Sequence, residues 1–213
     1  MILSYTFSKS IDDASAYLGD TADANFPQNS HDYRAEHALS SFNTPNRFVM
    51  AYVYQLPGHS LWTRNTSFRG IVAAQSGHPA TPILQFDNSN TGNTGSPVGN
   101  DRPNVVGNPH LANPSPSEWF NTAAFAIPPQ YTFGNAGRNI IMGPGLFTAD
   151  ISLVREIRLG ERESLSLEGQ AFNSLNRANF NLPELYVDNP GTFGRIFSAQ
   201  APRQIQFAAR FRF

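Results

Sequence analysis

The sequence contains no cysteine, which excludes disulfide bonds, thiolate metal sites and cysteine nucleophiles. Charge is also scarce, because Asp, Glu, Lys and Arg make up 15% of the 213 residues, against roughly 25% in an ordinary soluble domain. Lys9 is the only lysine, and 15 basic against 16 acidic side chains leave a formal net charge of -1. That balance argues against a nucleic-acid partner, which requires a surplus of clustered Lys and Arg.

Long hydrophobic runs are missing as well. The longest uninterrupted apolar segment covers residues 48–54, well short of the roughly 18 residues that a membrane-spanning helix needs. No basic segment precedes the first apolar residues, so no signal peptide is predicted. Membrane-spanning strands remain compatible with the sequence, because they need about 9–11 residues of alternating character.

Alternation of apolar and polar side chains, the period of a β-strand, is the strongest pattern in the sequence. It is clearest at the C-terminal end, where Phe207, Phe211 and Phe213 fall on one face and Arg210 and Arg212 on the other. Six strands are predicted, at residues 3–8, 48–56, 66–75, 147–153, 164–171 and 203–213. The predicted fold class is therefore all-β: an antiparallel, curved, open sheet of about six long strands, with sequence neighbours paired through hairpins.

The links between these strands alternate in length. Two links are short, whereas residues 10–46, 77–145 and 173–202 form long links rich in Asn, Gly, Pro and Ser, with at most short helical turns near 116–121. Loops of this length are unusual in a compact soluble domain, where the median is about 4–6 residues. Short turns on one side and long loops on the other are typical of outer-membrane barrels, so the sheet is predicted to be a partial segment of a large transmembrane β-barrel.

No metal site is predicted. Acidic residues crowd the first long loop and could hold calcium, but their spacing matches no known calcium loop, so a solvated acidic loop is the preferred interpretation. The run 87–92 lacks the glutamate that closes an EF-hand loop, and the histidines do not have the spacing of a zinc site. These acidic and histidine residues are Asp12, Asp13, Asp20, Asp23, Asp32, His31, His37, His59, His78 and His110.

No catalytic residue and no cofactor is predicted either. The glycine-rich segments 134–139 and 143–145 are not followed by the Lys-Ser/Thr of a phosphate loop, and the sequence has no Gly-x-Ser-x-Gly elbow. Two carboxylates could converge for glycoside chemistry, but nothing singles out a pair, so an enzyme is the weaker hypothesis. Aromatic residues near predicted strand ends, such as Tyr52, Tyr54 and Trp62, fit a membrane-interface belt, a carbohydrate platform or the core of a soluble sandwich.

Short segments of distinctive composition are spread over nearly the whole chain, among them SYTFSKSIDD at 4–13, FGNAGRN at 133–139 and NRANF at 176–180. The full set lies at residues 4–13, 46–49, 54–57, 76–79, 101–104, 119–125, 133–139, 172–173, 176–180 and 193–196. Each segment alone is a weak signal, whereas their order and spacing are specific. Taken together they resemble the C-terminal end of TonB-dependent outer-membrane receptors of the Oar-like branch.

This resemblance implies a function and a set of partners. Intact receptors of this kind move large ligands across the outer membrane with energy from an inner-membrane partner. The implied partners are outer-membrane lipid, the barrel-assembly machinery and, through an N-terminal part that these residues lack, TonB; the transported ligand is unknown. Phe207, Phe211 and Phe213 resemble the insertion signal that outer-membrane barrels present to their assembly machinery.

A complete receptor of this kind has about 22 strands, a plug domain and a signal peptide. Residues 1–213 are therefore expected to form a C-terminal fragment of the barrel in the bacterial outer membrane, without plug domain or signal peptide and without transport activity of its own. The alternative is a soluble β-sandwich that binds carbohydrate or protein through its long loops. The two hypotheses differ in what covers the apolar strand face, which is lipid in one and a second sheet in the other.

Overall fold

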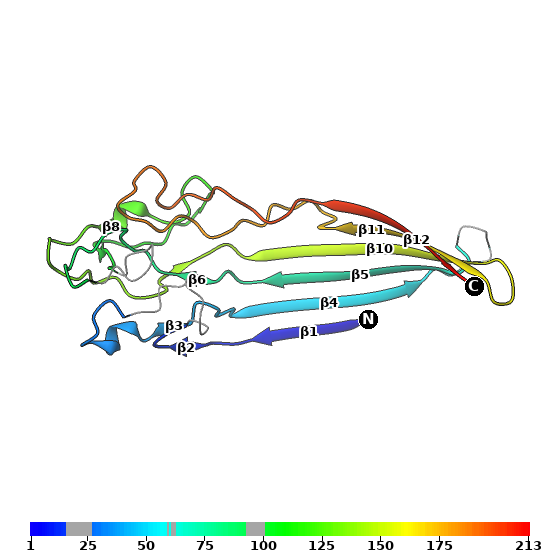
Figure 1. The fold of residues 1–213 in the computed structure, drawn as a ribbon, viewed down its shortest axis with the longest axis horizontal. Helices are drawn as coiled ribbons and strands as arrows, with labels where there is room; N and C mark the ends of the chain where they lie inside the picture. The colour runs from blue at the N-terminus through cyan, green and yellow to red at the C-terminus, as the bar shows by residue number, and fades with distance from the viewer. Residues whose placement is uncertain (16–26, 59, 61–62, 93–100) are drawn as a thin grey trace.

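The computed structural model describes residues 1–15, 27–58, 60, 63–92 and 101–213. Six long antiparallel strands form one open sheet, and the long connections gather at one end of it (Figure 1). The strands are β1 (Ile2–Phe7), β4 (Asn46–Gln55), β5 (Thr66–Gln75), β10 (Leu146–Arg158), β11 (Ser164–Phe172) and β12 (Gln204–Arg212). Their order in the sheet follows the sequence, so the predicted all-β, antiparallel, hairpin-connected sheet is confirmed.

The strands lie close to where alternation places them, with one informative exception. β10 continues to Arg158 instead of ending near residue 153. Arg155 is the cause, because it pairs with Thr66 and Leu167 on the apolar face and so interrupts the alternation of the sequence. Arg155 is half-buried and lies three residues before the end of β10, close to the short turn 159–163.

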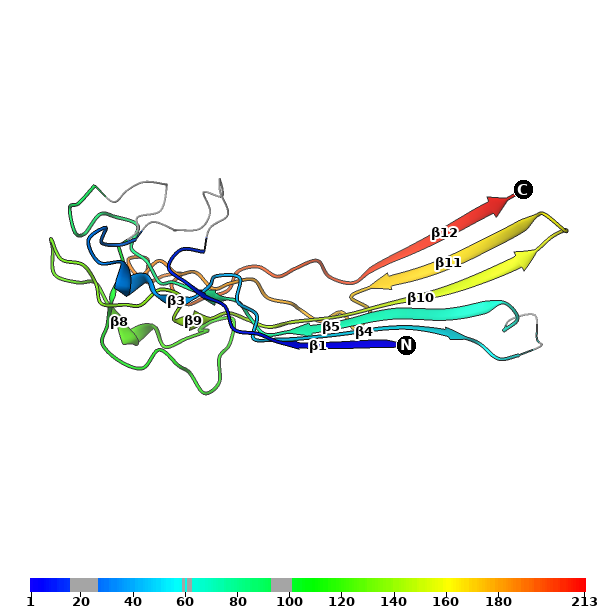
Figure 2. The same cartoon turned by 90° about the horizontal axis from the view of Figure 1, so that it is seen from below.

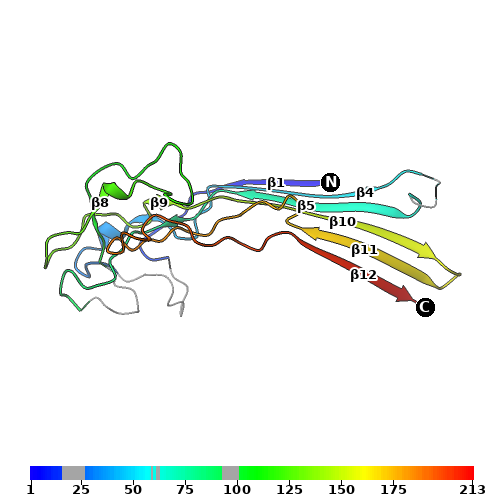
Figure 3. The ribbon, with the colours of Figure 1, turned by 90° about the horizontal axis from the view of Figure 1, so that it is seen from above.

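The sheet is curved and has two open edges. Seen along its plane, β11 and β12 turn away from the flatter region of β1, β4 and β5 (Figures 2 and 3). β1 and β12 lie at the two ends of the strand order, so each pairs on one side only within the described residues. The six strands therefore form an arc that does not close on itself.

The three long connections form an ordered loop cap at one end of the sheet, defined here as the described parts of 8–45, 76–145 and 173–203. Two-residue strands pair within the cap: β2 (Ile11–Asp12) with β3 (Ala38–Leu39), β6 (Pro79–Ala80) with β9 (Ile141–Met142), and β7 (Asn104–Val105) with β8 (Phe125–Ala126). Two 3-10 helices also occur, η1 (Tyr33–Glu36) and η2 (Thr122–Ala124). The second begins just after the region where a helical turn was predicted. The described chain contains no helix long and apolar enough to cross a membrane.

Nearly all of the hydrophobic core lies in the loop cap. Phe120, Phe125 and Phe193 pack edge to face with ring centroids 5.1–5.7 Å apart, and Leu84 is completely buried. The long strands contribute Ala149 alone to the buried apolar residues. Within the described residues no second sheet covers either face of the six-stranded sheet, so the alternative of a soluble β-sandwich is wrong.

Candidate functional site

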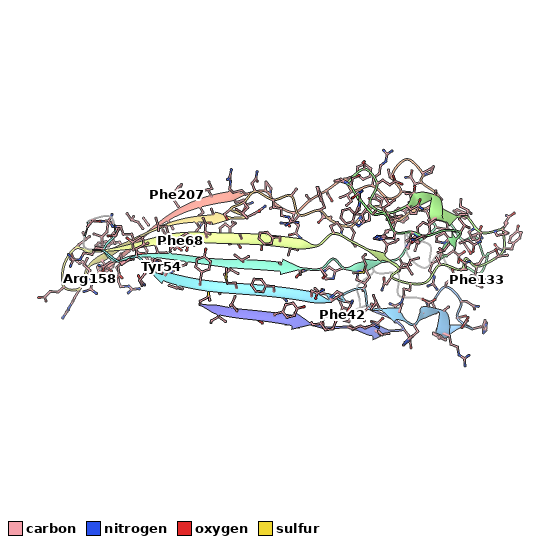
Figure 4. All side chains as sticks on the ribbon, turned by 180° about the vertical axis from the view of Figure 1, so that it is seen from behind. Phe42, Tyr54, Phe68, Phe133, Arg158 and Phe207 are labelled. Carbon is pink, nitrogen blue, oxygen red and sulfur yellow. The ribbon has the colours of Figure 1, made fainter. Side chains whose placement is uncertain are left out.

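One face of the sheet, called the outer face here, is mostly apolar. The strand register places its apolar residues in rows that run across neighbouring strands. One row of cross-strand neighbours runs over five strands from Tyr54 through Phe68, Leu153 and Gly169 to Phe207. Three of these residues are labelled in Figure 4. Tyr54 is 54% exposed and Phe207 is 83% exposed, and soluble monomers rarely expose a continuous apolar face of this extent. The outer face therefore requires an apolar environment.

Aromatic packing strengthens this face. The ring centroids of Tyr52 and Phe68 lie 5.5 Å apart, within the range in which tilted rings attract each other. Gly70 is the cross-strand neighbour of Tyr52, and a Cβ atom at Gly70 would lie 2.5 Å from the Tyr52 hydroxyl oxygen. Glycine thus leaves room for the tyrosine ring to lie across β5, which continues the aromatic surface over the strand.

The inner face of the same strands is mostly polar toward β12. The row next to the one just described runs from Gln55 through Ser67, Val154 and Glu168 to Ala208. Neighbouring residues of a strand point to opposite faces of the sheet. The residues next to those of the aromatic row therefore form this polar row on the other face. The five long strands other than β1 have 9–13 residues each. A tilted strand needs about 9–11 residues to cross a membrane, so these five are long enough.

The terminal strand continues both faces to the end of the chain. Phe207 and Phe211 pair with Gly169 and Leu165 of β11 on the outer face, as predicted. The Phe213 side chain follows β12 and stacks near Phe211 with ring centroids 6.1 Å apart. Phe213 is 93% exposed, so it is available to a surrounding lipid phase or to a protein partner.

Buried polar contacts hold the first and second long connections together. Arg138 donates from Nε to the Glu36 carbonyl at 3.0 Å, from Nη1 to Ser15 Oγ at 2.8 Å, and from Nη2 to the Asp12 carboxylate. Arg138 is buried, and these contacts span more than one hundred residues of sequence. A single guanidinium group therefore joins the first and second long loops.

A second buried ion pair lies beside the first. The Arg102 guanidinium donates to Glu36, and both side chains are almost completely buried. Glu36 also accepts a hydrogen bond from the backbone N–H of Gln28 at 3.1 Å, while the Gln28 side chain binds the backbone N–H of Arg102 at 2.7 Å. Burial lowers the pKa of Arg102 and the neighbouring Glu36 opposes that shift, so the charged pair is retained.

One comparison with known proteins decides the class of this molecule. A family model for an outer membrane beta barrel domain matches residues 1–206, which is nearly the whole chain. The chain belongs to this family. No curated protein and no solved structure gives a significant match.

Membership of the outer membrane beta barrel domain family explains the two faces of the sheet. In such a barrel the apolar residues face lipid and the polar residues face the interior. The curved open sheet is then an arc of barrel wall, with short turns at one end and the loop cap at the other. The location implied is the bacterial outer membrane.

The acidic residues of the first loop do not form a solvated acidic loop throughout, and this prediction was wrong for Asp12. Its carboxylate accepts hydrogen bonds from Arg138 and Ser15. Asp13 is exposed and lies 2.9 Å from His37 Nδ1, while Asp32 caps η1 by accepting from the Arg34 N–H. Asp20 and Asp23 lie outside the described residues. The carboxylates of Asp12, Asp13 and Asp32 therefore each contact a neighbouring group of the same cap.

No group of His, Asp and Glu that could hold a metal occurs among the described residues. Asp87 accepts from the N–H groups of Thr91 and Gly92 and from the Ser89 hydroxyl. Burial raises its pKa, but these hydrogen bonds outweigh burial and lower the pKa below the ordinary value. The run that resembles a calcium loop is therefore closed by its own backbone, and His59 and Trp62 are outside the described residues.

The buried residues of the loop cap were not singled out from the sequence. Arg102, Arg138 and Glu36 are polar residues in long loops, where charged side chains are normally solvated. The sequence did contain one indication of their importance. Arg102 and Arg138 lie inside two of the segments that carry the family resemblance, 101–104 and 133–139. Their partners could not be found without the fold, since the contacts join residues 66 to 126 positions apart.

Acid is expected to loosen the loop cap. Burial raises the pKa of Asp12, but hydrogen bonds from Arg138 and Ser40 outweigh it and hold the pKa below the ordinary value of 3.8. A carboxyl with a lowered folded-state pKa stabilises fully above its unfolded pKa and loses this contribution as pH falls through the folded value. The protection of the backbone amides of residues 36–40 against hydrogen exchange, relative to their intrinsic rates, should therefore fall below about pH 4. The Asp12→Asn variant should lack this acidic step, and an identical step in both proteins would contradict the assignment.

Proposed function

We propose that this chain forms the C-terminal strands of the barrel of a TonB-dependent receptor of the Oar-like branch, and that it is not an enzyme. The observation that carries the proposal is the arc of six strands with two open edges, combined with the ordered set of sequence segments. Unpaired N–H and C=O groups at an edge cost several kcal/mol each in hydrocarbon. Both edges therefore need further strands, and a large receptor barrel supplies them.

Three partners follow from this proposal. Outer-membrane lipid covers the outer face, and the assembly machinery binds the terminal strand through Phe207, Phe211 and Phe213. Any contact with TonB runs through a part of the receptor other than residues 1–213. The loop cap is the surface presented to the exterior, where its buried ion pairs hold two loops together in position to contact a ligand before transport.

The reading frame that precedes Met1 tests the receptor proposal directly. An in-frame continuation that encodes further strands and a plug domain is the expected result. A promoter or a signal peptide placed immediately upstream would contradict it, because six strands would then have to act as the complete protein. Sequencing the genomic DNA on the 5′ side of the codon for Met1 distinguishes the two outcomes.

The chain alone is expected to transport nothing, because an arc of six strands encloses no pore. Residues 1–213 reconstituted into liposomes should give no uptake of siderophore, oligosaccharide or peptide above the level of empty liposomes. A matched preparation of a complete porin provides the positive control for flux. Uptake that depends on this chain alone would overturn the proposed absence of transport.

Deleting Phe213 is expected to impair barrel assembly. The residue ends the outer-face row of β12 and is almost fully exposed, so its removal takes away an aromatic contact with the assembly machinery and leaves the sheet pairing intact. The deletion is made in a complete barrel that carries these strands, and surface display and heat-modifiable gel mobility are measured. Leu159→Ala, at an exposed residue of the short turn, serves as the control, and equal assembly with and without Phe213 would refute the role.

A further inference from the structure

A polar hollow of about 500 Å³ lies on the inner face of the sheet, near the end that carries the short turns. Its floor is β11, where Ser164 and Ser166 occupy successive inner-face positions. Ser164 pairs with Arg158 of β10 on one side and Arg212 of β12 on the other. Two small hydroxyl residues between longer arginines make a trough that follows β11.

In the next row of the trough a serine again lies between two longer charged side chains. Ser166 lies between Glu156 of β10 and Arg210 of β12. Arg69 of β5 also lines the hollow, and its Nε donates to Ser67 Oγ at 3.1 Å. Four arginines and two glutamates, Glu156 and Glu168, leave the lining with a net charge of +2.

No arginine of the trough takes part in an ion pair with another described residue. Within the described part of the chain the ion pairs are His37 with Asp13, Arg102 with Glu36 and Arg138 with Asp12, all of them in the loop cap. Glu168 instead accepts a hydrogen bond from Gln170 at 2.8 Å. Within the described residues, Arg158, Arg210 and Arg212 therefore line the hollow without a carboxylate partner of their own.

We propose that this trough binds an oxyanion, a carboxylate or phosphate group carried by a polar ligand. The planar guanidinium group offers paired donors that match both groups, and arginine is the residue used most for such recognition. The Ser164 and Ser166 hydroxyls add neutral donors at the floor. A cleft with an excess of one sign of charge also raises the local concentration of oppositely charged groups. The site depends on the sheet alone and does not rest on the receptor assignment.

Titration calorimetry tests the site in the full chain folded in non-ionic detergent micelles, with inorganic phosphate and citrate as probes. Saturable binding is expected for at least one probe. The Arg210→Gln/Arg212→Gln variant should bind it about tenfold more weakly or worse, since a hydrogen bond to a charged group is worth that much affinity. Tighter binding of phosphate indicates a phosphorylated ligand, and tighter binding of citrate indicates a carboxylate ligand.

Two further variants keep the test decisive. Arg195→Gln removes an exposed arginine of the loop cap and should leave binding unchanged; an equal loss in this variant would show general charge attraction and overturn the proposal. Ser166→Leu fills the trough and retains every arginine, so it should abolish binding even where the double arginine variant fails to fold. Absence of saturable binding by both probes, or undiminished binding in Ser166→Leu, would also overturn it.

Discussion

Replacing Glu36 with Gln is expected to destabilise the loop cap by about 3–5 kcal/mol, the usual cost of removing one partner from a buried ion pair. The Arg102 guanidinium would remain buried with no carboxylate to balance its charge, because Glu36 is its ion-pair partner. The loss should be confined to the cap, since the six long strands take no part in this contact. Native-state hydrogen exchange at residues 28–40 and 101–104 measures the free energy of opening.

Two further variants separate loss of the pair from loss of a carboxylate in general. Glu118→Gln removes an exposed carboxylate of the same cap and should change the opening free energy by less than about 0.5 kcal/mol. Glu36→Gln combined with Arg102→Met removes both charges and should recover part of the stability, because no uncompensated guanidinium remains. Equal destabilisation by Glu36→Gln and Glu118→Gln would contradict the role of the buried pair.

Arginine at position 209 is expected to prevent stable insertion of the sheet, whereas arginine at position 208 should be tolerated. Ala209 lies on the outer face beside Leu167, and Ala208 lies on the inner face beside Glu168. An arginine facing lipid at the bilayer midplane costs about 2–4 kcal/mol, and a substitution facing the interior costs much less. The two alanines are adjacent and central in β12, so the depth in the membrane is closely matched.

The measurement is denaturant unfolding of each variant from phospholipid vesicles, followed by heat-modifiable gel mobility and by tryptophan fluorescence. Ala209→Arg should lower the free energy of unfolding by about 2–4 kcal/mol. The free energy of unfolding of Ala208→Arg should stay near that of the parent protein. If both variants lose the same stability, or if the order is reversed, the assignment of the two faces is wrong.

The sequence predicts the sheet well because alternation is a local property. The outer-face row from Tyr54 to Phe207 can be read from residues two apart, and the strand order follows from the link lengths. β10 was predicted too short because Arg155, a charged residue, occupies an outer-face position near the turn. At such a position the polarity of a residue does not indicate which face of the sheet it lies on.

The loop cap could not be predicted from the same evidence. Its shape depends on contacts between Asp12 and Arg138 and between Glu36 and Arg102, which join separate loops. A charged residue in a loop has the same local sequence context whether it is solvated or buried in a pair. Arg102 and Arg138 lie in segments that carry the family resemblance, which singles out these two positions in the sequence. Their burial, which explains their role, appears only when the loops are folded together.

Labelling single cysteines on β12 tests most directly whether the outer face is covered by lipid. The chain has no native cysteine, so Ala208→Cys and Ala209→Cys each provide one unique site for a small fluorophore. With the protein folded in vesicles that contain spin-labelled lipid, strong quenching is predicted for the fluorophore at position 209 and weak quenching at position 208. Equal quenching at the two positions, or no quenching at either, would contradict an arc of barrel wall with one face in lipid.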